Sequence, residues 1–299
     1  GEYSEKMSLS LDQNDIEYYT NLFIKYGRNP TDIELYDLAQ SNSEHSRHSF
    51  FNGKLLLDYE SEDSKTLMEW IKYPLKINKN NSTLAFCDNA SAINGFTSTF
   101  LVNENEIGPS KIISKEYAYD ISFTAETHNF PTSIAPFPGA ATGTGGRIRD
   151  NQAIGQGGLP IAGTTGYCVG NLNIPNYILP WEDSPYKIDS LSTPLNILID
   201  ASNGASDYGN KFGEPVIQGF VRSFGNNLPS GDRIEWLKPI MFTGGIGVVL
   251  KSNLIKGNPE KEMVIIRLGG PAYRIGMGGG SASSRSYSEK DSVANFNAV

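Results

Sequence analysis

A glutamate and a histidine lie two residues apart in Thr124-Ala-Glu-Thr-His-Asn-Phe-Pro131, where a predicted strand runs out after Phe123. Side chains two residues apart in an extended segment point to the same side, so Glu126 and His128 form a carboxylate–imidazole pair. Strand ends that lead into loops are common positions for catalytic groups. Imidazole titrates near neutral pH, so the pair suits proton transfer. A solvated strand end without activity is the simpler interpretation of the same residues.

The other two histidines, His45 and His48, lie in Ser43-Glu-His-Ser-Arg-His48, near the end of a predicted helix. Residues three apart share a helix face, so the two imidazoles have the spacing of a base pair or a ligand pair. Taken alone, the segment favours a polar helix end in solvent. With Glu126, the two histidines would instead make a two-histidine, one-carboxylate site for a transition metal.

Glycine is abundant, at 31 of 299 residues, and it is concentrated at 139–170 and 269–280. In Gly139–Asp150, small residues with a helix-like continuation would present backbone N–H groups to phosphate oxygens, and two arginines follow for anionic groups. Asp150 has the donor type that Mg²⁺ prefers. The stretch is neither a Walker A loop nor a dinucleotide fingerprint, and tight packing without a ligand is equally compatible with it. Gly269–Ser284 predicts either a second phosphate site or a flexible turn.

The two cysteines, Cys87 and Cys168, indicate a reduced intracellular protein rather than a disulfide framework. Either thiol, with a histidine partner, has the chemistry of a nucleophile. Both lie in predicted strands, so we favour buried, inert thiols.

Composition and charge exclude several classes of protein. The net charge is −8 and the pI is about 5.0, which is the wrong balance for a general nucleic-acid binder. No apolar run approaches the roughly 18–20 residues that span a bilayer, and the first residues have no signal-peptide character. We therefore expect a cytoplasmic protein that binds neither nucleic acid nor membrane.

The pattern of apolar residues predicts helices first and a mixed domain afterwards. Helices are expected at 16–26, at 31–47 after a Thr31–Glu34 capping box, and at 64–72. Strands are expected at 84–87, 118–124, 161–169, 195–200, 216–221 and 262–268, with a short helix at 202–208. This mixture predicts an α/β or α+β fold. Loop composition at 226–232 predicts a boundary near Arg233, and the short remainder without a terminating signal suggests truncation.

Together the motifs resemble one family, the large eukaryotic-type phosphoribosylformylglycinamidine (FGAM) synthases of purine biosynthesis. Ser46 stands where many members have cysteine, so that position is not expected to carry the chemistry. The matching segments are Ala39–His48, Thr124–Thr132, Gly139–Asp150, Leu179–Asp183, Ala201–Val216, Lys238–Phe242 and Gly269–Ser284.

The resemblance implies an architecture. It places a helical linker at 1–40, an N-terminal α/β domain like that of aminoimidazole ribonucleotide (AIR) synthetase at 41–232, and the truncated start of the C-terminal α+β domain at 233–299. It also implies that a complete core pairs two such halves in a barrel-like arrangement. The chain alone would then leave an apolar pairing surface open and have little or no activity.

The resemblance implies a ligase reaction as well. ATP activates the amide oxygen of formylglycinamide ribonucleotide (FGAR) as an iminophosphate, and ammonia displaces phosphate to give FGAM and ADP. A glutaminase domain of the same polypeptide supplies the ammonia from glutamine, and the remaining half of the synthetase completes the site. The alternatives are another ATP-using AIR-synthetase-like enzyme and a nucleotide-binding half without its own activity.

Residue roles follow from the same resemblance. His45 would be an active-site histidine and His128 a proton acceptor, while Glu126 and Asp150 would bind Mg²⁺. Substrate would lie against Thr127, His128, Asn129, Phe130 and Arg149. His48 replaces a nucleotide-contacting tyrosine of smaller relatives, so its role carries over only weakly. The ATP-binding residues would be Gly139, Ala140, Ala141, Thr142, Gly143, Thr144, Gly145, Gly146, Arg147, Ile148, Arg149 and Asp150, with further nucleotide contacts at Gln218, Gly219 and Phe220.

Overall fold

The computed structural model describes residues 2–7, 9–43, 49–54, 65–105, 107–183, 188–271 and 279. Its helices are α1 (Glu2–Lys6), α2 (Gln13–Lys25), α3 (Asp32–Asn42), α5 (Ser49–Asn52), α6 (Leu67–Ile77), α7 (Asn129–Ile134), α8 (Pro136–Gln152), α9 (Pro194–Lys211) and the 3₁₀ turn η1 (Lys251–Asn253). Its strands are β1 (Ser82–Leu84), β2 (Ser91–Asn103), β3 (Ile112–Thr127), β4 (Leu159–Val169), β5 (Val216–Ser223), β6 (Gly225–Asn227), β7 (Arg233–Glu235) and β8 (Ile240–Leu250).

Capping side chains set the starts of the N-terminal helices. At α3, Thr31 accepts a hydrogen bond from the N–H of Glu34, and the Glu34 carboxylate accepts one from the N–H of Thr31, as the sequence predicted. Arg28 donates two hydrogen bonds to the same carboxylate and, with the Thr31 N–H, lowers the pKa of Glu34 to about 2. We expected this helix to continue to Arg47. It ends at Asn42 instead, because the backbone of Ser43 is extended.

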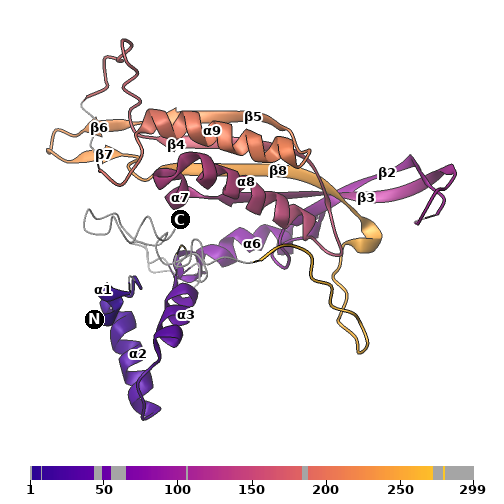
Figure 1. Ribbon diagram of the computed structural model, residues 1–299, viewed down its shortest axis with the longest axis horizontal. Coiled ribbons are helices and arrows are strands. Elements are labelled where there is room, and N and C mark those ends of the chain that lie inside the picture. Colours follow the sequence, from indigo (N-terminus) through magenta and orange to yellow (C-terminus); the bar gives the residue numbers. More distant parts are fainter. Residues whose placement is uncertain are drawn as a thin grey trace.

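A six-stranded sheet organises the rest of the described chain, in the order β1-β2-β3-β8-β4-β5. Every neighbouring pair is antiparallel except β4 and β5, which are parallel and connected through α9. The strand latest in sequence, β8, lies between β3 and β4 (Figure 1). The carboxyl ends of β3, β4 and β5 therefore meet at one edge, where β8 begins.

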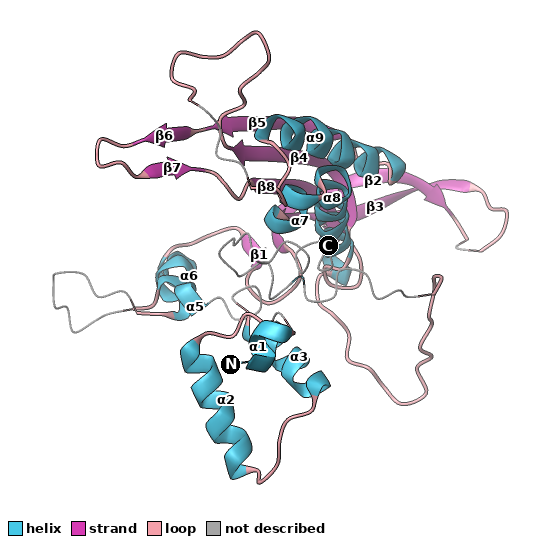
Figure 2. Ribbon diagram, turned by 60° about the vertical axis from the view of Figure 1, so that its left-hand side comes forward, coloured by secondary structure: helices cyan, strands magenta, loops and turns pink. Residues whose placement is uncertain are grey.

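Helices cover one face of this sheet. In Figures 1 and 2, α7, α8 and α9 lie together along it, and α8 contacts β3, β4 and β8. The core between these layers is built from small and apolar side chains: Ala140, Tyr167, Ala201, Ala205 and Met241. A second cluster fills the region near the end of α8, made of Leu84, Ala90, Ala92, Ile154, Val249 and Leu254.

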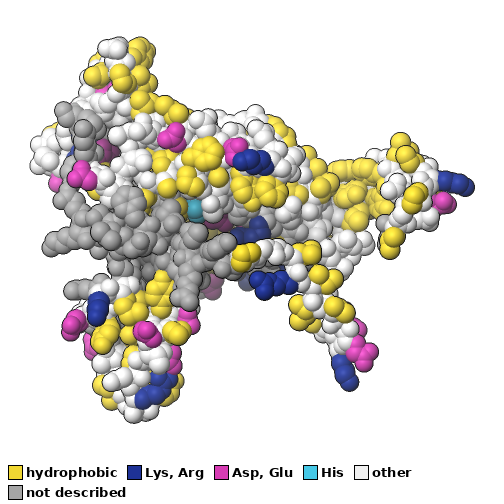
Figure 3. Space-filling view, viewed as in Figure 1, with side chains coloured by type: hydrophobic (Ala, Val, Ile, Leu, Met, Phe, Trp, Pro, Cys, Tyr) yellow, Lys and Arg dark blue, Asp and Glu magenta, His cyan; other side chains and the backbone are white. Residues whose placement is uncertain are grey.

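The opposite face of the sheet is apolar and exposed. Cross-strand partners share a face, and on this side they include large side chains that are 38–61% exposed: Phe123, Leu159, Phe220, Ile240 and Ile246. The face continues onto the projecting β2–β3 arm, where Phe96, Phe100, Tyr117 and Tyr119 pack on one another. Hydrophobic side chains are also visible on this arm from the helix side, in Figure 3. The face is exposed and apolar, and the expectation from the resemblance that such a surface pairs with another half of the core stays a prediction.

One arginine crosses the interface between the helices and the sheet. Arg147 of α8 is fully buried, and its guanidinium is ion-paired with Glu214, which is 2% exposed. Its Nε also donates to Thr243 Oγ1 at 3.3 Å. The side chain passes over Gly163 of β4 and Gly245 of β8, which are cross-strand partners, and a Cβ on either glycine would overlap it.

Three of the expected strands are wrong. At 84–87, β1 ends at Leu84 and Phe86 has a φ of +59°, so the chain turns and Cys87 is exposed rather than buried. The segment 262–268 begins in a turn, where Glu262 has a φ of +77°, and it is exposed and forms no strand in the described chain. Four strands were not expected at all: the short β6 and β7, the long β2, and β8, whose glycines hide its strand pattern.

The third wrong strand, 195–200, is helical, and it is continuous with the expected short helix at 202–208 in α9. Thr193 caps α9 by accepting the N–H of Asn196, and Pro194 occupies its first turn. The expected helix at 64–72 lies at α6, which starts after a Thr66–Glu69 capping box. No helix in the described ranges is both long and apolar enough to cross a membrane.

The expected domain division between residues 232 and 233 stays a prediction. Strand β8 lies beyond that division and is nevertheless central in the sheet, so the sheet itself extends to Leu250.

An aspartate fastens the β1–β2 connection to the end of α8. Asp88 accepts hydrogen bonds from the N–H of Gly155 at 3.2 Å and from Lys256 Nζ, which also donates to the carbonyl of Ala153. Burial opposes ionisation, but the hydrogen bonds from Lys256, Asn89 N–H and Gly155 N–H outweigh it and lower the pKa of Asp88.

We predict that Glu214→Ala lowers the free energy of unfolding by about 3–5 kcal/mol, because it leaves the Arg147 charge buried without a partner. The matched control is Asp207→Ala, which breaks an exposed pair with Lys211 and costs less than about 1 kcal/mol. Urea unfolding measures both. Equal losses in the two variants would contradict a structural role for the buried pair.

We also predict that Asp88→Asn flattens the acid dependence of stability. A carboxyl with a lowered pKa contributes stability that is complete above its unfolded value of about 4 and is lost as the pH falls through the folded value. The free energy of unfolding of Asp88→Asn should therefore decline less steeply than that of the parent below about pH 4. Asp200→Asn, at an exposed carboxylate of α9, serves as the control and should follow the parent.

Candidate functional site

The glycine-rich stretch is a helix rather than a loop. All of Gly139–Asp150 lies inside α8, which begins with Pro136 and Pro138, so its backbone N–H groups are used within the helix. The expected phosphate cradle of exposed N–H groups is therefore wrong. The glycines serve close packing instead: a Cβ on Gly145 would lie 2.5 Å from the Tyr208 ring of α9.

Only one face of α8 is open to a ligand. Thr142 and Arg149 are exposed, and Gly146 and Asp150 are half-buried, at a spacing that places them on the same side of the helix. Most of the other residues of the stretch are in the core: Gly139, Ala140, Gly143, Thr144, Gly145, Arg147 and Ile148. The expectation that Arg147 binds an anionic ligand does not fit, because its guanidinium is committed to Glu214.

His128 is held at the end of β3 by three hydrogen bonds of its own and one made by Asn129. Its N–H donates to the carbonyl of Met241 at 3.0 Å, and its own carbonyl accepts from Thr132 Oγ1 at 2.5 Å. Its Nδ1 lies 2.5 Å from the carbonyl oxygen of Gly139 on α8. The next residue, Asn129, accepts the Met241 N–H through Oδ1 at 2.9 Å, which fastens the strand end to β8.

Phe130 has a structural position in this fold. It is 2% exposed, so its ring is one of the buried side chains of α7. The expected substrate contacts at Asn129 and Phe130 stay predictions.

Glu126 and Asp150 lie on either side of Arg149. The Glu126 side chain approaches α8 at Gly146, whose Cβ position is 4.0 Å from Glu126 Cγ and 3.8 Å from a terminal nitrogen of Arg149. Arg149 Nε donates to Asp150 Oδ1 at 2.9 Å. The hydrogen bond that Arg149 donates to Asp150 and the charges of both carboxylates raise the pKa of Arg149 above its usual range.

This donor set suits Mg²⁺ in kind and number. The ion takes one or two protein carboxylates and completes its shell with phosphate oxygens and water. Within the described ranges, no group of three or more histidine, cysteine, aspartate or glutamate side chains is placed to hold a metal by itself. Phosphate oxygens would therefore have to supply the remaining ligands, and Arg149 would have to share Asp150.

The structure separates the other expected contacts from this group. Thr127 pairs with Phe242, and Phe220 packs near Phe242 at 6.2 Å between ring centroids, so both lie on the open face of the sheet. Gln218 is on the same outer strand, and its carbonyl accepts from Thr164 Oγ1 at 2.9 Å. Glu126 and His128 face the helices instead. Gln218 and Phe220 are thus not brought to the His128 side, whereas Gly219 pairs with Thr165 and lies on the helix side of the sheet.

Several expectations are not addressed by the described residues. His45 and His48 lie outside them, as does most of Gly269–Ser284. The transition-metal alternative, which needs both histidines, therefore stays a prediction. Of the two thiols, Cys168 is half-buried in β4 and Cys87 is exposed.

Two residues, Asn89 and Lys238, were given no functional role by the sequence analysis. Asn89 Nδ2 donates to Asp150 Oδ1 at 3.4 Å, although it is distant in sequence. Lys238 precedes β8 at the edge where β3 ends, and burial lowers the pKa of its ammonium group. A loop Asp-Asn pair and a lysine before a proline were the available signals, and neither is specific.

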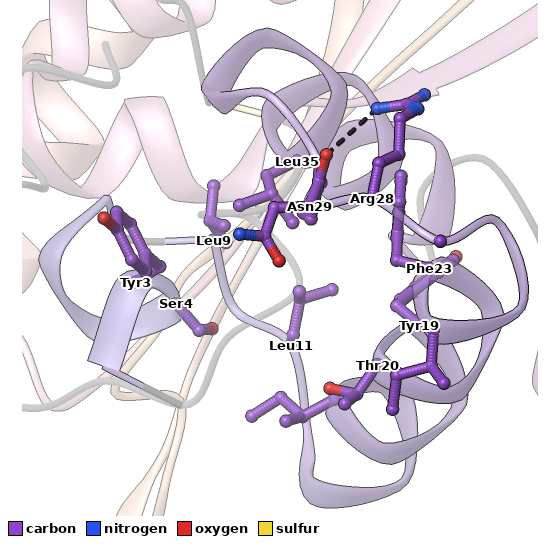
Figure 4. A pocket seen from close by; sticks show the side chains of 14 residues that line it. Tyr3, Ser4, Leu9, Leu11, Tyr19, Thr20, Phe23, Arg28, Asn29 and Leu35 are labelled. Atoms are coloured by element: carbon purple, nitrogen blue, oxygen red, sulfur yellow. Dashed lines mark hydrogen bonds between the residues drawn. The ribbon is translucent and has the colours of Figure 1, made fainter.

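A separate cavity of about 530 Å³ lies among the N-terminal helices. Figure 4 shows Leu9, Leu11, Tyr19, Phe23 and Leu35 around it, with the Asn29 side chain among them. The residues that line it include none of those assigned to the site on α8.

Comparisons with known proteins agree with the motifs. Residues 1–48 match the model of the formylglycinamide ribonucleotide amidotransferase linker domain. The phosphoribosylformylglycinamidine synthase of Dictyostelium discoideum is 56% identical over 298 residues, which cover 99% of this chain and 22% of that protein. The probable phosphoribosylformylglycinamidine synthase, chloroplastic/mitochondrial, of Arabidopsis thaliana is 54% identical over 304 residues, covering 100% of this chain and 21% of that protein.

A solved structure confirms the mixed α/β fold. The structure of T. maritima PurL complexed with FGAR aligns with a TM-score of 0.50 and 23% identity, over 90% of this chain and 32% of that one. Over its whole length the chain is thus related to phosphoribosylformylglycinamidine synthases, of whose length it spans about a fifth, and the resemblance that its motifs indicated is confirmed.

Proposed function

We propose that this chain supplies part of the synthetase site of an FGAM synthase, which converts FGAR, ATP and glutamine-derived ammonia into FGAM, ADP and phosphate through an iminophosphate. The observation that carries the proposal is the identity of 56% over 298 residues with a named synthase. The clustering of Glu126, His128, Arg149 and Asp150 along one face of α8 supports it independently.

In this proposal, His128 is the group that moves a proton. Its backbone is fixed to Met241 and its ring to Gly139, so the imidazole has a defined direction relative to α8. A positioned base of this kind contributes about 10²–10⁴-fold to a reaction rate. His45 remains a second proposed active-site histidine.

The accessible face of α8 would meet the phosphates of ATP through side chains. Arg149 is 69% exposed and carries a fixed positive charge, which suits a phosphate or the ribonucleotide phosphate of FGAR. Glu126 and Asp150 would hold Mg²⁺, which when bound neutralises charge on the transferring phosphoryl group. Nucleotide contacts at Gln218 and Phe220 would belong to a different surface, on the open face of the sheet, while Gly219 lies on the helix side of β5.

The proposal extends to the surroundings of the site. The remaining synthetase half and a glutaminase domain of the same polypeptide would complete the enzyme, with the exposed apolar face of the sheet available for pairing. The division into linker, N-terminal domain and start of a second domain is part of the proposal. A cytoplasmic location is also proposed, although the name of the Arabidopsis relative places that protein in organelles.

We predict that His128→Ala and Glu126→Ala each lower phosphate release by about 10²-fold or more in the longer polypeptide that contains these residues. Release is measured with Mg-ATP, ammonium and FGAR, omitting each in turn. Lys211→Ala, at an exposed position of α9, should retain the parental rate. The chain 1–299 alone should show little or no turnover.

Each failure of this experiment has a separate meaning. Phosphate release that does not need FGAR would show that the substrate is wrong. Full activity in both variants would show that this part of the chain binds nucleotide without taking part in the reaction.

A further inference from the structure

His128 makes an unusual contact with the backbone of a helix. Its Nδ1 is 2.5 Å from the carbonyl oxygen of Gly139, an atom that can only accept a hydrogen bond. The proton of this hydrogen bond must therefore be on Nδ1. In the neutral ring the lone pair is then on Nε2, because each neutral imidazole has one N–H and one acceptor nitrogen.

Two glycines one helical turn apart let the ring approach so closely. A Cβ on Gly143 would lie 2.8 Å from His128 Cβ and 3.1 Å from Met241 Sδ. A Cβ on Gly139 would lie 2.6 Å from the N–H nitrogen of Thr132, the residue that also binds the His128 carbonyl. A side chain at Gly143 would force the end of β3 away from α8, and a side chain at Gly139 would force α7 away from it.

We infer that Gly139 and Gly143 are positioning residues that hold His128 in its Nδ1–H tautomer, so that Nε2 is the nitrogen that accepts a proton. The catalytic half of this inference rests on the proposed function, whereas the tautomer does not. The glycines of this stretch thus act through the histidine, in place of the exposed phosphate-binding backbone that their sequence suggested.

The tautomer is measured directly in the parent chain. The chain 1–299 has three histidines, so ¹⁵N-histidine labelling and two-bond ¹H–¹⁵N spectra above pH 8 give three resolvable imidazoles, and His128→Gln identifies the one that matters. We expect a protonated Nδ1 and an unprotonated Nε2 for His128. The Nε2–H tautomer in the parent chain would overturn the inference, whatever the variants do.

The positioning role is measured with Gly143→Ala. We expect His128 to lose its single Nδ1–H form, and in the longer polypeptide we expect kcat to fall by about 10- to 100-fold with KM for ATP changed less than about twofold. Gly145→Ala is the matched control for the spectra, because its methyl group meets Tyr208 instead of His128 and should leave the tautomer unchanged. Gly257→Ala, with no atom within 4 Å of its Cβ position, should leave both spectra and rates unchanged.

The outcomes distinguish the positioning of His128 by the glycines from the catalytic role of His128. A tautomer that changes equally in Gly143→Ala and Gly145→Ala would indicate general strain in α8 and overturn the positioning role. An unchanged tautomer in a folded Gly143→Ala would do the same. An Nδ1–H tautomer in an enzyme that keeps full activity after His128→Ala would leave the geometry standing and remove the proposed function.

Discussion

The buried pair between Arg147 and Glu214 constrains most of this fold. A guanidinium in the interface between α8 and the sheet needs both a counter-charge and room. The counter-charge comes from the segment between α9 and β5, and the room comes from Gly163 and Gly245 on adjacent strands. The pair therefore fixes the positions of α8, α9, β4, β5 and β8 relative to one another. A displacement of any one of these elements would shift the others.

This constraint also divides α8 into two faces with different roles. Arg147 points inward and sets the depth at which the helix lies on the sheet, and Arg149, two residues later, points outward between Glu126 and Asp150. The same depth brings the backbone of the first turn to the ring of His128. Core packing and the geometry of the candidate site are thus set by one helix, with no separate scaffold for each.

Local rules predicted what depends on neighbours in the sequence. The capping box at Thr31 marked the start of α3, and the two-residue spacing placed Glu126 and His128 on one side of β3. The rest depended on tertiary contacts. The apolar run at 195–200 looked like a strand although Thr193 and Pro194 signalled a helix start. The glycines of α8 were compatible with either an exposed phosphate site or tight packing, because their packing partners, Tyr208 and His128, are remote in sequence. Two arginines two residues apart gave no sign of which would be buried.

The central position of β8 has a consequence for how the chain is made. Strands β3 and β4 do not pair with each other, and the strand that joins them begins only at Ile240, well after β4 ends at Val169. Protein synthesis adds about 5–20 residues per second. The edges of β3 and β4 that later pair with β8 therefore remain unpaired for on the order of ten seconds while the chain is still on the ribosome. Unpaired edges of that kind are templates for misassociation, so the nascent chain, more than the finished one, is the state in which chaperones matter.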